Sequence, residues 1–128
     1  MKPLPNLTSA SCLLVDDYDQ FRELMARYLR VECAIAVETA ASAEEALAKL
    51  ERRSYDVLVA DYYLKAPLDG ADLIRMCSVR WPNMRRVLLT SHTTGEMFGE
   101  LPADEVLDKM LHHKLVLETI CRRAKTPR

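Results

Sequence analysis

The chain has 128 residues, enough for one domain with a hydrophobic core, and 49% of them are hydrophobic, which excludes a disordered chain. Its formal net charge of −1 argues against a surface devoted to nucleic acid. No apolar run approaches the roughly 20 residues of a membrane span, and Met1–Asn6 lacks the apolar core of a signal peptide. We therefore expect a cytoplasmic domain that binds neither membrane nor nucleic acid directly.

The cysteines give no sign of a disulfide framework or a metal site. They are widely spaced, without a Cys-x-x-Cys pair, and three of them fall in apolar segments. Buried, reduced thiols are the favoured interpretation over disulfides or metal ligands. The four residues are Cys12, Cys33, Cys77 and Cys121.

Residues 1–10 are expected to form a flexible leader, because Pro3 and Pro5 hinder regular structure. A first strand follows at about Ser11–Val15. The next segment, about Asp19–Val31, has the apolar spacing of one helical face, and a second strand is expected at about Ala34–Thr39. The apolar residues of that helix are Phe21, Leu24, Met25 and Tyr28.

The middle of the chain carries its clearest signals. Ser42 and Glu45 fit a capping box, in which Ser42 is the N-cap and Glu45 reaches back to it. The helix that they begin is expected to end near Arg53. The apolar run Val57–Ala60 then predicts a buried strand that ends at Asp61.

The second half of the chain begins with a turn, since Pro67 and the pair Asp69-Gly70 favour one. A helix is expected at about Ala71–Arg80, ended by Pro82. The remaining elements are a strand at Arg86–Leu89, at most a short helix around Glu96–Glu100, a strand at Glu105–Leu107 and a helix at Leu111–Arg123.

Strands and helices that alternate along a chain predict an α/β protein with a parallel sheet and helices on both faces. Right-handed crossovers and this length fit a flavodoxin-like, five-stranded sheet of order 2-1-3-4-5. The fourth helix, between the fourth and fifth strands, is expected to be reduced or absent. In this order the first and third strands are neighbours at the topological switch point.

The chemically active side chains follow the ends of the strands. Asp16 and Asp17 follow the first strand, Asp61 the third, Thr90 the fourth and Lys109 the fifth. Because ligand sites of open α/β sheets lie at the carboxyl ends of the strands, these groups are expected to converge on one pocket.

Three carboxylates in one cleft repel one another unless a cation joins them, and a hard cation such as Mg²⁺ prefers oxygen ligands. Such a cation would also help Asp61 to attack phosphorus, because the charge of the phosphoryl oxygens must be neutralised. Lys109 would serve a second phosphoryl oxygen as a point charge, and the Thr90 hydroxyl a third. The product would be an aspartyl phosphate.

With these residues in this order, the chain resembles the receiver domain of bacterial two-component response regulators, from Ser11 to about Arg123. The motif residues at the strand ends and in the loop before the third helix carry the resemblance. They are Asp16, Asp17, Asp61, Asp69, Gly70, Thr90 and Lys109.

The resemblance implies Mg²⁺-dependent phosphorylation of Asp61 by a sensor histidine kinase or a phosphotransfer protein. It implies that Asp16, Asp17, Asp61 and the backbone carbonyl of Tyr63 hold the metal, and that Thr90 moves toward the phosphoryl group. The switch would then act on a downstream protein partner or effector domain. On this interpretation residues 11–123 form the receiver domain, and residues 124–128 are a tail or the start of a linker.

The sequence departs from the family pattern in four places. Met110 follows the lysine where the family usually has proline, and Val106 replaces a frequent aromatic residue. The loop after Asp61 is one residue longer than usual, with Lys65 where proline is common, and the segment before the fifth strand is short, which puts dimerisation through that surface in doubt. Bulky side chains beside the site, Tyr63 and His92, suggest a shielded acyl phosphate.

Two other functions compete. One is a phosphorylation-independent, or pseudo-receiver, interaction module, which the missing proline and short segment would suit. The other is a phosphatase with an aspartyl nucleophile, but a haloacid-dehalogenase-like site needs a second aspartate where this chain has Tyr63. We therefore expect no turnover enzyme. The histidines lack zinc-ligand spacing, and no glycine-rich loop supports a nucleotide fold.

Overall fold

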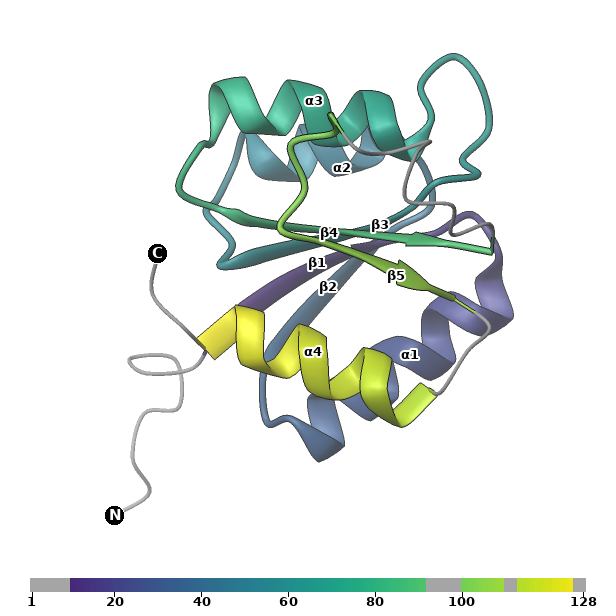
Figure 1. The fold of residues 1–128 in the computed structure, drawn as a ribbon, viewed down its shortest axis with the longest axis vertical. Helices are drawn as coiled ribbons and strands as arrows, with labels where there is room; N and C mark the ends of the chain where they lie inside the picture. The colour runs from purple at the N-terminus through teal and green to yellow at the C-terminus, as the bar shows by residue number, and fades with distance from the viewer. Residues whose placement is uncertain (1–9, 92–99, 110–112, 126–128) are drawn as a thin grey trace.

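The computed structural model describes residues 10–91, 100–109 and 113–125, and it shows strands and helices in alternation (Figure 1). The elements are β1 (Ser11–Val15), α1 (Asp19–Glu32), β2 (Ala36–Ala40), α2 (Ala43–Leu50), β3 (Val57–Asp61), α3 (Gly70–Arg80), β4 (Arg85–Thr90), β5 (Glu105–Asp108) and α4 (His113–Lys125). Here α4 denotes the helix after β5. None of the helices in these residues combines the length and the hydrophobicity that a membrane span requires.

The five strands form one parallel sheet in the order β2-β1-β3-β4-β5, which confirms the predicted topology. α2 and α3 cover one face of the sheet, and α1 and α4 lie together on the other (Figure 1). The described residues between β4 and β5 include no helix. The expected short helix at 96–100 falls almost wholly outside the described residues.

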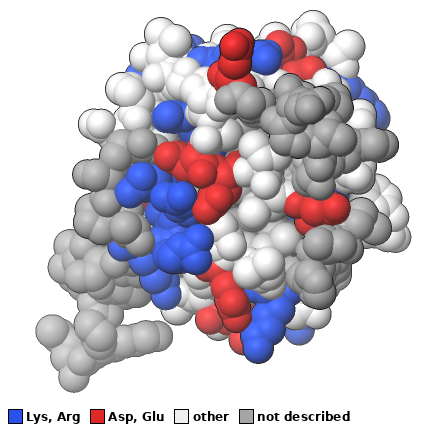
Figure 2. Space-filling model, in the orientation of Figure 1, with Lys and Arg blue, Asp and Glu red and all other residues white. Residues whose placement is uncertain are grey.

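Charged side chains of both signs lie side by side on the surface, as the small net charge suggests. Figure 2 shows Lys and Arg beside Asp and Glu between the start of β5 and the end of α4. Arg123 and Arg122 approach the Glu105 carboxylate there, with nitrogen–oxygen distances of 3.2 and 3.5 Å.

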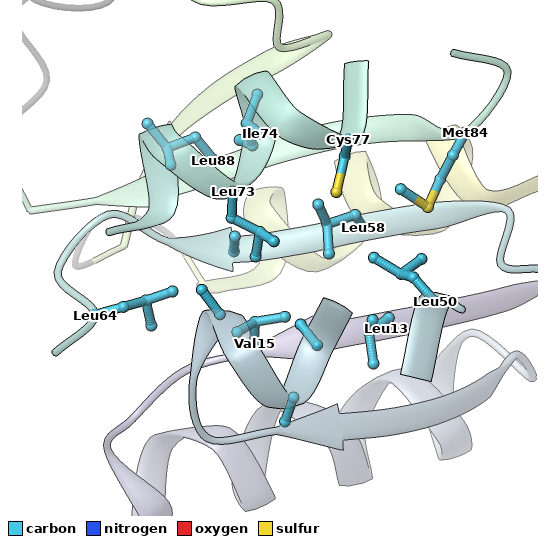
Figure 3. Close-up of a cluster of buried hydrophobic side chains, with 14 of the residues drawn as sticks. Leu13, Val15, Leu50, Leu58, Leu64, Leu73, Ile74, Cys77, Met84 and Leu88 are labelled. Atoms are coloured by element: carbon cyan, nitrogen blue, oxygen red, sulfur yellow. The ribbon is translucent and has the colours of Figure 1, made fainter. Parts of the chain in front are cut away.

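The alternation of side chains along β1 and β3 divides the core into two clusters, one on each face of the sheet. Leu13 and Leu58 point toward α2 and α3, in the cluster of Figure 3. Their neighbours Leu14 and Val59 point toward α1 and α4. Both strands are buried on both faces, which explains their nearly continuous apolar sequence.

Helix caps set the start of α2 and α3. Ser42 caps α2 as predicted, since its Oγ accepts from the Glu45 N–H at 3.1 Å. The Glu45 carboxylate, however, accepts from the Ala41 N–H at 3.1 Å, so the reciprocal bond reaches one residue further back than expected. A complete capping box, which the sequence prediction missed, joins Asp69 and Asp72 at the start of α3.

Two element boundaries differ from the prediction for local reasons. β2 begins at Ala36 rather than Ala34, because Ala34 has φ 54°, in the left-handed region that no strand residue occupies. α2 ends at Leu50 rather than near Arg53, and the Arg53 N–H closes the following turn on the Lys49 carbonyl at 3.2 Å.

The prediction of four reduced cysteines is wrong for one pair. Cys33 and Cys121 form a disulfide, with Cα atoms 5.7 Å apart, whereas Cys12 and Cys77 are free and buried. The bonded residues are separated by 88 positions in sequence. They meet because α1 and α4 pack on the same face of the sheet, which cysteine spacing alone does not reveal.

Candidate functional site

The three predicted acids meet at the carboxyl ends of β1 and β3. The strands are adjacent and in register, with Val15 opposite Ala60, so the residues that follow lie level with one another. Carboxylate oxygens of Asp16, Asp17 and Asp61 lie within 4.8 Å of one another. We call these three residues the acid cluster.

Lys109 enters the acid cluster from the end of β5. Its Nζ lies 2.8 Å from Asp16 Oδ2 and donates a hydrogen bond to Asp61 Oδ2 at 3.2 Å. The Lys109 backbone N–H donates to the Thr90 carbonyl at 2.9 Å, which ties the lysine to the end of β4. The structure therefore brings the predicted cation and the predicted acids together.

Burial and neighbouring charges shift the pKa values of Asp61 and Lys109. Burial raises the pKa of Asp61, and the charge of Asp16 raises it further, while Lys109 and the Tyr63 backbone amide act in the opposite direction. Burial by itself lowers the pKa of Lys109, but the two carboxylates together outweigh it, so that pKa is raised. Lys109 is therefore held as a cation, and the deprotonated form of Asp61 is disfavoured.

Asp16 is held on both sides by α1 and the loop before it. Its Oδ1 accepts from the Tyr18 N–H at 2.8 Å, and its backbone carbonyl accepts from Arg22 Nη1 at 2.9 Å. Asp16 is completely buried, whereas Asp17 is half-buried. The two acids of the pair thus differ in access to solvent, which their adjacent positions in the sequence could not show.

One oxygen of the site has no partner among the described residues. Asp61 Oδ1 is buried and accepts no hydrogen bond there. An unpaired buried carboxylate oxygen is costly, and two further carboxylates close by add repulsion that one lysine only partly offsets. Three carboxylates with an open oxygen are the donor set that a hard divalent cation prefers, so the residues present fit Mg²⁺.

The chain after β3 is held close to Asp61. The Gly70 N–H donates to the Tyr62 carbonyl at 2.9 Å, and the Tyr62 N–H donates to the Leu89 carbonyl at 2.8 Å. A Cβ atom on Gly70 would lie 2.1 Å from the Asp61 carbonyl oxygen. Glycine is therefore required at this position for steric reasons.

Thr90 is the last residue of β4 and is completely buried at the same edge of the sheet. Tyr63 follows Asp61 by two residues, and its side chain is 48% exposed. Val106 is half-buried against the core cluster of α2 and α3. The expectations for His92 and Met110 concern residues outside the part of the chain that the structure describes.

Sequence reasoning missed the contribution of α1. Lys109 Nζ lies 4.3 Å from the centre of the Phe21 ring, a cation–π distance. The apolar spacing of the helix indicates only that Phe21 lies on its buried face, and it gives no role to Arg22. The one available signal was that both residues follow the acid pair closely, on the first turn of the helix.

The family model of the response regulator receiver domain matches residues 12–120. Together with the sheet order and the acid cluster, this match defines a signalling module of two-component systems. The chain belongs to the response regulator receiver domain family. No curated protein sequence matches it.

Solved structures agree with this assignment. The chemotaxis response regulator CheY4 of Vibrio cholerae is 27% identical, with a TM-score of 0.81 over 91% of this chain and 99% of that one. A CheY-like receiver domain protein of Methanospirillum hungatei is 25% identical, with a TM-score of 0.81 over 91% and 94%. Response regulator TrrA of Thermotoga maritima, solved with Mg²⁺–BeF, is 24% identical and shows the same fold, with a TM-score of 0.80 over 89% and 98%.

Proposed function

We propose that this receiver domain accepts a phosphoryl group on Asp61 in a Mg²⁺-dependent reaction. The observation that carries the proposal is Asp61 Oδ1, which is buried and accepts no hydrogen bond from any residue that the structure describes. Two further carboxylates lie close by, and Lys109 contacts the other oxygen of Asp61. A buried carboxylate oxygen without a partner lowers the stability of the folded protein, which is expected of a site that is kept for a ligand.

The proposed roles follow from the positions of the groups. Asp61 is the nucleophile, and its free oxygen forms the new bond to phosphorus while the bond to the donor breaks. Lys109 balances negative charge on the phosphoryl oxygens, and Thr90, at the adjacent strand end, donates its hydroxyl to one of them. Asp16, Asp17, Asp61 and the Tyr63 carbonyl would hold Mg²⁺, which supplies charge neutralisation when bound.

The donor in this proposal is a sensor histidine kinase or a phosphotransfer protein, which loses the phosphoryl group from a histidine nitrogen. The output is altered binding to a downstream protein partner or effector domain. The domain spans residues 11–123, acts in the cytoplasm, and is not a turnover enzyme. Mg²⁺ is its only proposed cofactor.

Tyr63, which is half-exposed two residues after Asp61, is proposed to slow hydrolysis of the acyl phosphate. Tyr63→Ala is therefore expected to lose its phosphoryl group faster than the wild type. An unchanged rate of dephosphorylation would refute this role.

A second candidate is a receiver-like module that binds its partner without phosphorylation. The described residues between β4 and β5 include no helix, and that region lies next to the proposed switch residue Thr90. This candidate predicts partner binding that is unaffected by Asp61→Asn.

Amide NMR with Mg²⁺ and beryllofluoride, which mimics a phosphoryl group on aspartate, tests the proposal without a known kinase. Shift changes at Asp17, Asp61, Thr90 and Lys109 are expected in the wild type and are expected to vanish in Asp61→Asn. Asp56→Asn is the matched control, because Asp56 is an exposed aspartate just before the same strand. If the wild type shows no change, the phosphorylation proposal is wrong and the second candidate takes its place.

A further inference from the structure

The disulfide between Cys33 and Cys121 has no part in the proposed phosphorylation. Cys33 is the C-cap residue of α1, and Cys121 lies in α4. The two helices pack on the same face of the sheet and share one core cluster, to which α1 contributes Met25 and Leu29 and α4 contributes Ile120. The bond thus joins two helices that apolar contacts already hold together.

A groove of about 660 Å³ runs along this disulfide between α1 and α4. Its volume falls in the range of sites for small molecules, about 300–1,000 Å³. Both cysteines line the groove, and Cys121 is half-buried. The charged lining consists of Lys114, Arg122 and Lys125 against Glu32 and Glu118. A small anionic reagent therefore has space and a slight excess of positive charge beside the sulfur atoms.

The two other cysteines are chemically protected. Cys12 and Cys77 are completely buried, and burial raises the pKa of each thiol to about 12. Because the thiolate is the reactive form, both are inert in the folded protein. Thiol chemistry of the described residues is therefore confined to Cys33 and Cys121.

The disulfide also joins α4 to α1, the helix that contacts the acid cluster and Lys109. The first turn of α1 meets the site through the Phe21 ring, 4.3 Å from Lys109 Nζ, and through the bond from Arg22 to the Asp16 carbonyl. α4 begins shortly after Lys109 in the chain. The bond thus links the far end of α1 to a helix that follows the site lysine.

We propose that Cys33 and Cys121 are a reversible thiol–disulfide site, which fixes α4 to α1 when oxidised and releases that link when reduced. This inference rests on the cytoplasmic location proposed above, because a disulfide in a cytoplasmic protein usually forms transiently and senses the redox state. The oxidant is a small-molecule disulfide of the glutathione type, and the reductant is the corresponding thiol.

Oxidation proceeds by two exchanges. The more accessible Cys121 thiolate attacks one sulfur of the small disulfide, which forms a mixed disulfide and releases one small thiolate. The Cys33 thiolate then attacks the Cys121 sulfur and releases the second. The protein gives up two electrons and two protons, and the small disulfide is reduced to two thiols.

The test is a titration of the wild-type protein in buffers of varied ratio of reduced to oxidised glutathione, followed by alkylation of the folded protein and intact-mass measurement. Reduced protein is expected to take a label at the half-buried Cys121, and oxidised protein none. Cys12→Ala/Cys77→Ala, which retains the pair, is expected to give the same titration, and Cys121→Ser is expected to lose it. On reduction, the melting temperature is expected to fall by roughly 5–15 °C in the wild type and in Cys12→Ala/Cys77→Ala, and to stay unchanged in Cys121→Ser.

A pair that stays bonded in excess reduced thiol would be a permanent cross-link, and a pair that stays labelled in oxidised glutathione would be two independent thiols. Either result overturns the proposal. The titration contains neither Mg²⁺ nor beryllofluoride, so its failure leaves the phosphorylation proposal untouched. The wild-type titration also needs no variant to fold.

Discussion

The two edges of the sheet handle buried charge in opposite ways. At the amino-terminal edge, the buried Arg86 donates from Nε to the Pro102 carbonyl at 2.8 Å and from Nη1 to the carbonyls of Met84 and Pro82 at 2.8 and 3.3 Å. Its backbone exchanges two hydrogen bonds with Asp104, of 2.8 and 2.7 Å. We call Arg86 and these partners the arginine cage.

At the carboxyl-terminal edge, the acid cluster gathers three carboxylates around one lysine and leaves Asp61 Oδ1 unpartnered among the described residues. The arginine cage satisfies its charge and stabilises the connection between β4 and β5. The acid cluster leaves its charge available. The same sheet therefore separates stability from ligand chemistry by placing them at opposite ends of its strands.

Asp61→Asn gives the largest expected effect, because it removes the nucleophile. We expect complete loss of modification by a phosphoryl donor, with no loss of stability, since the substitution also removes repulsion with Asp16. Intact mass and urea unfolding measure the two quantities, with Asp56→Asn as the control. A modified variant, or one destabilised as strongly as an arginine-cage variant, would contradict the comparison.

Arg86→Ala is expected to show the reverse pattern. It leaves three backbone carbonyls without their donor and is expected to lower the free energy of unfolding by about 2–4 kcal/mol. The folded fraction is expected to keep its beryllofluoride response. Arg75→Ala, an exposed arginine on α3, is the matched control, with an expected change below about 0.5 kcal/mol. If the two substitutions lowered the free energy of unfolding equally, the arginine cage would have no special stabilising role.

Gly70→Ala tests how closely the loop after β3 supports the acid cluster. The added Cβ would collide with the Asp61 backbone, so we expect a loss of about 1–3 kcal/mol in unfolding free energy. Beryllofluoride binding, followed by amide NMR, is expected to weaken as well because the strand end must shift. Unchanged stability and binding would show that the backbone at Asp61 can shift to accommodate the added Cβ without loss of unfolding free energy.

Mg²⁺ is expected to stabilise the protein through the acid cluster alone. At ten to a hundred times its dissociation constant, the gain in unfolding free energy is about 1.4–2.7 kcal/mol. Thermal unfolding with and without Mg²⁺ measures it. Asp17→Asn is expected to lose most of the gain and Asp56→Asn none, and equal gains in both variants would place the cation elsewhere.

The smallest expected effect is a pH dependence from Asp61. Its pKa is raised by burial and by Asp16, so the contribution of this group to stability is full below the unfolded-state pKa of about 3.9 and is lost as the pH rises through the raised folded pKa. The stability of Asp61→Asn relative to wild type is therefore expected to increase with pH across that window. Urea unfolding at a series of pH values measures it, and a flat difference would contradict the raised pKa.

Local patterns in the sequence determined most of the fold and the members of the site. The apolar run Val57–Ala60 predicts a buried strand, and Asp61, the acid directly after it, falls at the end of that strand. Alternation of strands and helices, with right-handed crossovers, then leaves few sheet orders, and the predicted one places Asp16, Asp17, Asp61 and Lys109 together.

Only the tertiary structure decided which distant residues touch. The disulfide of Cys33 and Cys121 and the contact of Phe21 with Lys109 each join α1 to a region 88 residues away. The carbonyls that hold Arg86 come from two loops whose shape no residue spacing encodes. Sequence periodicity reports which face of an element is buried, whereas these contacts depend on how helices and loops pack on the finished sheet.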